Sequence, residues 1–156
     1  MFAALLVLLL QSTSVKGTLE VPPGGTPPPT ARVVLLPLQY ARQFNADAQI
    51  RIDNYWESFK GAGLARRNKE LFIQYMPIIY ESVLETVVAE MRRDSKVNFA
   101  SLVKTAPQGH FEFTNVPPGE YKLVATAAIR GEDFVWTETI QVESTGLVVQ
   151  MKTRVP

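Results

Sequence analysis

The sequence predicts a mainly β domain: a seven-stranded antiparallel β-sandwich with an α-helical insertion between its second and third strands. Both ends of the chain contain segments in which every second residue is apolar, the pattern of strands with one buried face. Residues 38–96 follow helical spacing instead. A chain of 156 residues, 46% of them apolar, is long enough to bury one such core.

The chain begins with ten residues that are almost all apolar, followed by Gln11-Ser12-Thr13-Ser14. Ten helical residues reach about 15 Å, half of a bilayer core, which is too short for a transmembrane helix. The pattern is typical of a signal peptide cleaved after Ser14, although no Lys or Arg precedes it. We expect residues 1–14 to be signal-peptide-like or to contact a membrane, with a buried N-terminal strand or helix as the alternative. Residues 15–156 then form the domain, in the periplasm or outside the cell, with membrane association left open.

Two strands are expected next. Residues 16–21 alternate in the strand sense, and Ala31 to Leu36 form a second apolar segment that Pro37 closes. Residues 22–29 between them are rich in proline and glycine. Because proline has no backbone donor for a β-ladder, this stretch is expected to be a surface loop.

The first expected helix carries one apolar stripe at helical spacing, which consists of Ile52, Tyr55, Trp56 and Phe59. Asn45 or Asp47 is expected to cap its start, and Gly61 or Gly63 its end. A second helical segment opens near Leu64. Pro77 is expected to kink or end that segment at Met76, because its ring clashes with the preceding turn.

A third helical segment is expected after Pro77, with Glu81 near its start and Arg92 and Arg93 near its end, the charge order that a helix dipole favours. Strands then resume over residues 97–104, 111–113, 121–125, 134–142 and 147–151, which completes seven. Pro118 and Gly119 suit the central positions of a type II turn, so the segment around them is expected to form a hairpin.

Residues 109–125, Gly-His-Phe-Glu-Phe-Thr-Asn-Val-Pro-Pro-Gly-Glu-Tyr-Lys-Leu-Val-Ala, resemble the motif G-x-F-x-F-x-x-(L/V)-P-P-G-x-Y-x-L-x-A of the carboxypeptidase regulatory-like domain. That family has a transthyretin-like, immunoglobulin-like β-sandwich. Residues 17–21 and 31–35 follow the order of its first two strands, so the resemblance covers about residues 16–37 and 97–154. The resemblance implies a module that supports, spaces or binds. It also implies that the motif residues determine the fold: Phe111, Phe113, Pro118, Gly119, Tyr121 and Leu123.

Few residues suit catalysis. The chain has no cysteine, which excludes disulfides, thiolate metal sites and a cysteine nucleophile, and its net charge of +1 gives no case for nucleic acid. His110 is the only histidine, too few for a zinc site or a triad. Asp53 and Glu57 are four residues apart and share one face of a helix, and we interpret that face as exposed to solvent and not as a calcium or acid–base site. We therefore expect that the protein is not an enzyme and that it binds no cofactor and no metal ion.

The insertion departs from the family pattern and is the best candidate for recognition. Tyr55, Trp56 and Phe59 stand among charged residues, a composition typical of interface hot spots, although they could equally dock the insertion onto the sandwich. Arg66 and Arg67 would form a charged rim, with a solvated helix face as the alternative.

These observations favour a non-enzymatic, exported accessory or structural subunit. It would make protein–protein contacts through the insertion, in a periplasmic or membrane-associated assembly. The alternative is a β-sandwich module that binds a carbohydrate or another small ligand. The two differ in whether the partner of the chain is a protein or a small molecule.

Overall fold

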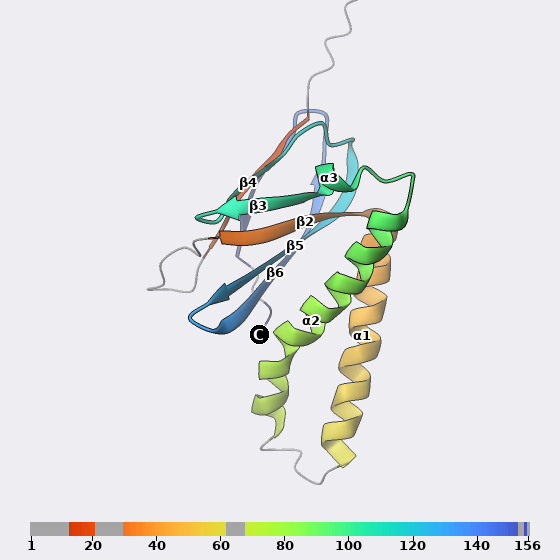
Figure 1. Cartoon of the computed structure of the whole chain (residues 1–156), viewed down its shortest axis with the longest axis vertical. Coiled ribbons are helices and arrows are strands. Elements are labelled where there is room, and N and C mark those ends of the chain that lie inside the picture. Colours follow the sequence, from red (N-terminus) through yellow and green to blue (C-terminus); the bar gives the residue numbers. More distant parts are fainter. Residues whose placement is uncertain (1–12, 21–29, 62–67, 153–154, 156) are drawn as a thin grey trace, which may run out of the picture.

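The computed structural model describes residues 13–20, 30–61, 68–152 and 155 (Figure 1). Its described strands and helices follow in the order β1 (Val15–Leu19), β2 (Thr30–Pro37), α1 (Leu38–Gly61), α2 (Asn68–Arg93), α3 (Phe99–Leu102), β3 (Val103–Pro107), β4 (His110–Phe113), β5 (Gly119–Ile129), β6 (Glu132–Val142) and β7 (Leu147–Met151). The prediction of seven strands is therefore confirmed.

The strands form a three-stranded sheet in the order β4-β1-β7 and a four-stranded sheet in the order β3-β2-β5-β6. Four of the five neighbouring pairs with a described register are antiparallel, and β1 and β7 are parallel. The prediction of a wholly antiparallel arrangement is wrong at this pair. Parallel neighbours need a long connection, and here most of the chain lies between the two strands.

One hydrophobic core joins residues of both sheets. Val15 and Phe113 of the three-stranded sheet belong to the same buried cluster as Leu35, Leu123 and Trp136 of the four-stranded sheet. These side chains sit at alternating positions of their strands, as the pleat requires. The buried Trp136 donates from Nε1 to the carbonyl oxygen of Glu20 at 3.1 Å, so its one polar group is satisfied.

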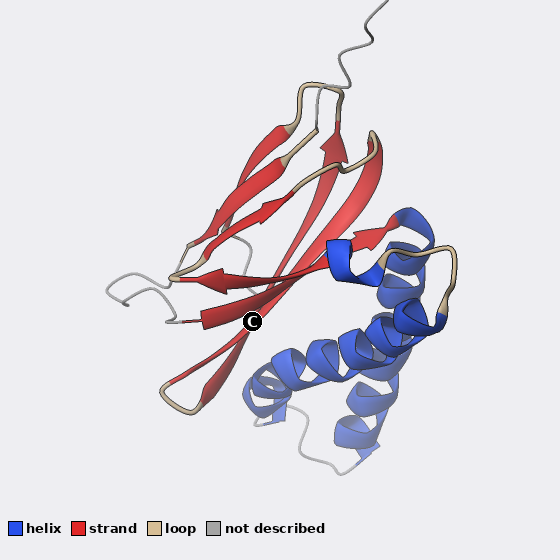
Figure 2. Cartoon of the chain, turned by 45° about the horizontal axis from the view of Figure 1, so that its top comes forward, coloured by secondary structure: helices blue, strands red, loops and turns tan. Residues whose placement is uncertain are grey.

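A second core lies on the other face of the four-stranded sheet, which α1 and α2 cover (Figure 2). Val34 and Val124 of the sheet pack in one cluster with Phe44 of α1 and Leu84 and Val87 of α2. Because this sheet is covered on both faces, β2 carries four consecutive, fully buried apolar residues, Val33 to Leu36.

The helices differ from prediction at two points. α1 begins at Leu38, directly after β2, so Asn45 and Asp47 lie inside it and do not cap it. Tyr40, Ala41 and Phe44 of its first two turns are buried in the core under the helices, and this packing favours a helix that starts directly after β2. α2 continues through Pro77, so the two predicted segments on either side are one helix, whose ribbon changes direction in Figure 1. Burial of Phe72 and Ile79 on both sides of the proline offsets the lost hydrogen bond.

The predicted hairpin around Pro118 is also wrong. β4 and β5 belong to different sheets, so residues 114–118 cross from one sheet to the other. Gly119 has φ 154°, far from the value near 80° that a type II turn requires. The predicted burial of Phe111, Phe113 and Tyr121 is confirmed. The alternation of apolar residues indicates which side of a strand is buried, but it does not indicate which strand is its neighbour.

The turn between β5 and β6 and the short helix before β3 also bear on the predictions. Arg130 and Gly131, with φ of 55° and 76°, connect β5 and β6 as a two-residue hairpin, at the predicted turn. Residues 99–102 form α3, where a strand was predicted to run from 97 to 104. Leu102 of this short helix packs partly buried against both cores, and that packing overrides the strand propensity of the segment.

Gly17 is required in β1 because Phe111 lies over it. The two residues are opposite each other in the antiparallel pair of β1 and β4. A Cβ atom at Gly17 would overlap the Phe111 ring and would lie 2.7 Å from the carbonyl oxygen of Val149. Phe111 is 5% exposed, so a shift of its ring would disturb the core in which it is buried.

We expect Gly17→Ala to lower the free energy of unfolding by about 1–3 kcal/mol, the usual cost of overfilling a core. Urea unfolding measures this change. Gly131→Asn is the matched control: nothing lies within 4 Å of a Cβ atom there, and asparagine tolerates the positive φ. Equal stability of Gly17→Ala and the wild type would contradict the packing of Phe111 over Gly17.

Candidate functional site

The helical pair extends beyond the sheets. α1 has 24 residues and α2 has 26, which correspond to about 36 Å and about 39 Å of helix. The buried contacts with the sheet come from Tyr40 to Ala48 of α1 and from Ile79 to Met91 of α2. The remaining parts, residues 49–61 and 68–78, form a projection that Figure 1 shows below the sheets, and we call it the helical tip.

The predicted aromatic residues of the tip have different surroundings. Trp56 is half-buried and meets Phe72 of α2 edge-on, with ring centroids 5.3 Å apart. Its neighbour Tyr55 is 48% exposed. Trp56 therefore joins the two helices, whereas Tyr55 is available to a partner. Phe59 belongs to α1, but its side chain lies outside the described residues, as do Arg66 and Arg67.

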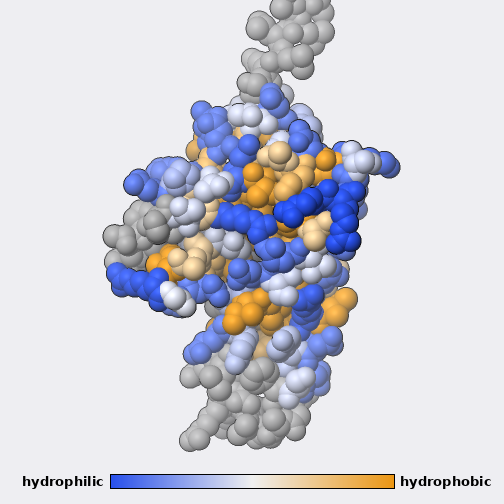
Figure 3. Space-filling model, viewed as in Figure 1, coloured by the Kyte–Doolittle hydropathy of each residue, from blue (hydrophilic) through white to orange (hydrophobic). Residues whose placement is uncertain are grey.

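Sequence reasoning missed further exposed apolar residues of the tip. Besides Tyr55, these residues are Ile50, Ile73, Tyr75 and Ile78. Ile50 is 58% exposed and Ile78 is 51% exposed. Figure 3 shows hydrophobic side chains at the surface of this lower, helical part of the molecule. We call these five residues the tip surface.

Two residues of the tip surface continue buried stripes. Tyr55 follows Ala48 by seven residues, about two helical turns, and so lies on the same side of α1. Ile73 precedes Met91 by eighteen residues, about five turns, and lies on the same side of α2. Ala48 and Met91 are buried. The apolar stripes therefore continue past the end of the sheet that covers them. The helical spacing of these residues in the sequence could have identified this continuation.

A groove lies beside the tip, between α2 and the turn that joins β5 and β6. It has a volume of about 540 Å³ and is lined by Ile73, Gln74, Pro77, Ile78, Gly131, Glu132 and Asp133. One wall is largely apolar, and the other carries two carboxylates. The groove extends the tip surface toward the sheet.

A separate pocket of about 630 Å³ lies at the opposite end of the helical pair. We call it the end pocket; it is lined by Pro37, Gln39, Tyr40, Asp94, Lys96, Val97, Asn98, Ser101, Leu102, Thr114, Asn115, Pro117 and Tyr121. The Tyr40 hydroxyl donates to Asp94 Oδ2 at 2.5 Å, and the Lys96 backbone N–H donates to Asp94 Oδ1 at 3.0 Å. These bonds favour the ionised carboxylate and lower the pKa of Asp94, the Tyr40 bond more than the Lys96 bond.

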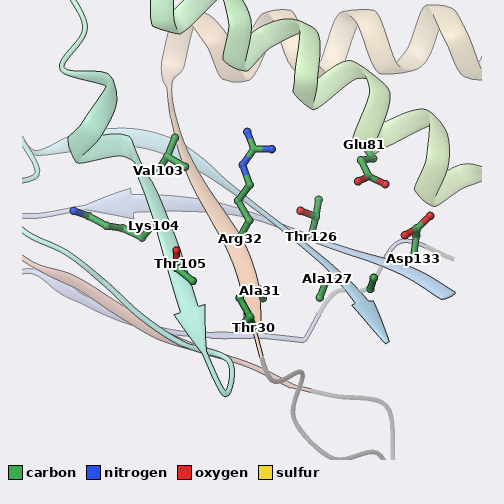
Figure 4. A pocket seen from close by; sticks show the side chains of 11 residues that line it. Thr30, Ala31, Arg32, Glu81, Val103, Lys104, Thr105, Thr126, Ala127 and Asp133 are labelled. Atoms are coloured by element: carbon green, nitrogen blue, oxygen red, sulfur yellow. The ribbon is translucent and has the colours of Figure 1, made fainter. Parts of the chain in front are cut away.

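A third, more charged depression lies where α2 crosses the outer face of the four-stranded sheet (Figure 4). Arg32 of β2 donates to Glu85 of α2. Glu81 lies close by, and its pKa is raised, first by burial and then by the charges of Asp133 and Glu85, which Arg32 opposes. The depression has a volume of about 430 Å³, and its charged lining residues are Arg32, Glu81, Lys104 and Asp133.

The other candidates from the sequence stay apart. His110 is exposed on β4, and Asp53 accepts a bond from Gln49 Nε2 at 2.8 Å on the exposed side of α1. Within the described ranges, no three His, Asp or Glu side chains gather as metal ligands. Neither long helix is apolar enough over its described length to cross a membrane.

Comparisons with protein-family models, with curated proteins and with solved structures found no match for this chain.

We expect Trp56→Ala to reduce the free energy of unfolding by about 1–3 kcal/mol, because it removes the aromatic contact that joins the two helices of the tip. Tyr55→Ala should change it by no more than about 0.5 kcal/mol, as is usual for an exposed position. Urea unfolding of both variants tests the difference. Equal losses would mean that Tyr55 is also a packing residue.

We expect Glu81→Gln to raise the melting temperature at pH 7. The folded state binds a proton at Glu81 more tightly than the unfolded chain, so the wild type loses stability as the pH rises through 4.5 and the raised pKa. Glutamine has no charge to bury and removes this loss, so the melting temperatures of the variant and the wild type should converge near pH 3. Thermal melts from pH 3 to 8 measure the effect, with Glu120→Gln as the exposed control. A lower melting temperature at pH 7 would contradict it.

Proposed function

We propose that this chain is a non-enzymatic accessory or structural subunit whose helical tip contacts a protein partner. We further propose that it is exported and works in a periplasmic or membrane-associated assembly. In this proposal the two sheets are a transthyretin-like sandwich that serves as scaffold, as in the carboxypeptidase regulatory-like domain that residues 109–125 resemble.

The observation that carries the proposal is the exposure of the tip surface. Tyr55 and Ile73 continue stripes that are buried wherever the sheet lies beneath the helices. Burial of apolar area stabilises by about 25 cal/mol per Å², so a partner surface that takes the place of the missing sheet would gain free energy. Exposed apolar residues that gather on one part of a protein surface are typical of interaction sites.

The surroundings of the tip surface suit a protein partner. Arg51, Asp53 and Glu57 bring charges of both signs to the same part of α1. An apolar centre with a polar rim is the usual composition of a protein–protein interface. Tyrosine and isoleucine at the centre add large contact areas, and tyrosine is enriched among residues that dominate binding energy.

We expect a photo-cross-linking amino acid at position 55 or 78 to form one discrete adduct with a partner protein in cells that express the full-length chain. The same amino acid at position 148 is the matched control, because Val148 is 83% exposed on β7, far from the tip. Adduct formation at 55 and 78 but not at 148 is read by gel electrophoresis and mass spectrometry.

The double variant Tyr55→Ser/Ile78→Ser should lose the same partner by at least tenfold in co-purification, with its melting temperature within about 2 °C of the wild type. No adduct at either tip position, or the same adduct at position 148, would overturn the proposal. Trp56 is not used in this test because it joins the helices.

A further inference from the structure

The end pocket is built from four segments that are distant in the sequence. Its walls come from the start of α1, from residues 94–102, from the crossover between β4 and β5, and from Tyr121 of β5. A volume of about 630 Å³ is within the range of pockets that bind small molecules. It exceeds the volumes of the groove beside α2 and of the depression around Arg32, about 540 and 430 Å³.

The polar side chains of the pocket are mostly uncharged groups that both donate and accept. They are three amides and two hydroxyls, from Gln39, Asn98, Asn115, Ser101 and Thr114. A ligand hydroxyl also donates and accepts, so the amides match it in both roles. The Ser101 hydroxyl donates to the carbonyl oxygen of Asn98 at 2.7 Å and can accept from a ligand. Pro37, Val97, Leu102 and Pro117 add apolar surface against which the C–H faces of a ligand ring can pack.

The two charged residues of the pocket have opposite signs. Asp94 and Lys96 are two positions apart and both line it. An anionic or a cationic ligand would meet one like and one opposite charge, whereas an uncharged ligand would meet no repulsion. The charge pattern therefore favours a ligand without net charge.

Internal hydrogen bonds hold the pocket in shape. Tyr40 donates to Asp94 at 2.5 Å and so joins α1 to the segment that follows α2. The Tyr121 hydroxyl donates to the carbonyl oxygen of Pro117 at 2.7 Å and fixes the crossover. A pocket whose walls are held before binding loses little side-chain freedom when a ligand enters.

At least one polar group has no structural task in the fold. Asn98 precedes α3 but makes no side-chain capping bond to it, and it is exposed. Asn115 sits in the crossover with φ 55°, a conformation that asparagine tolerates better than most residues. Asn98 can therefore be replaced with little effect on stability, and Asn115 can be replaced by glycine, which keeps the positive φ.

We propose that the end pocket binds a neutral, hydroxyl-rich ligand of the carbohydrate class. Asn98, Asn115 and Gln39 exchange hydrogen bonds with its hydroxyl groups, and the ionised Asp94 accepts one. The apolar residues cover the C–H face of a sugar ring. This site is separate from the helical tip, and it stands or fails independently of the protein-partner proposal.

The test begins with the full-length chain on an array of neutral mono- and oligosaccharides that also carries their uronic-acid and amino-sugar counterparts. NMR titration then measures the affinity of the best glycan. We expect saturable binding of at least one neutral glycan, with the largest shifts at residues 94–102 and 114–117, and at least tenfold weaker binding of its charged counterparts.

The double variant Asn98→Ala/Asn115→Gly should bind that glycan at least tenfold more weakly, because glycine preserves the positive φ while the amide is lost. Asn54→Ala, an exposed amide on the tip, is the matched control and should bind as the wild type does. If the double variant fails to fold, Asn98→Ala alone decides. The proposal is overturned by no saturable neutral glycan, by equal binding of charged counterparts, or by unchanged binding in the variants.

Discussion

The arrangement of this molecule depends on the burial of β2 from both sides. Val33 and Leu35 enter the core shared by the two sheets, while Val34 and Leu36 enter the core beneath the helices. A shift of β2 by one residue in its pairing register would move every side chain to the opposite face of the sheet. Because β2 is apolar on both faces, its apolar residues alone would tolerate such a shift. Arg32 prevents the shift, since it reaches Glu85 of α2 from the helical face and would otherwise enter the inner core.

The position of the helices follows from this strand. α1 starts at the residue after β2, without a loop, so the direction of the strand fixes where the helix leaves the sheet. Lys122 of β5 then holds the first turns: its Nζ donates to Asn45 Oδ1 at 2.6 Å and lies 5.4 Å from the centre of the Phe44 ring. Burial lowers the pKa of this lysine, and the ring and the amide compensate for part of the lost hydration. The ends of both helices away from the start of α1 extend beyond the sheet and form the tip (Figure 1).

The sequence predicted what local periodicity determines and missed what tertiary contacts determine. Alternation located the buried sides of β4, β5 and β6, and the stripe at Tyr55 and Trp56 identified a helix. Alternation could not show that β4 and β5 belong to different sheets, because a strand looks the same whichever partner it pairs with. Pro77 predicted a kink or a break by a local rule; the helix continues through it with a change of direction (Figure 1), because residues on both sides of the proline are buried. The end pocket had no signal, since its residues come from four separate segments.

The section of the helices that packs on the sheet separates the two candidate sites. The contact between Tyr40 and Asp94 closes the helical pair at the end pocket, and Trp56 and Phe72 close it at the tip. Between these contacts lie the fully buried residues of the second core, among them Phe44 and Leu84. The two candidate sites are therefore separated by a closely packed core. The proposed protein surface and the proposed ligand pocket thus lie at opposite ends of one helical pair, and the sheet fixes the position of both.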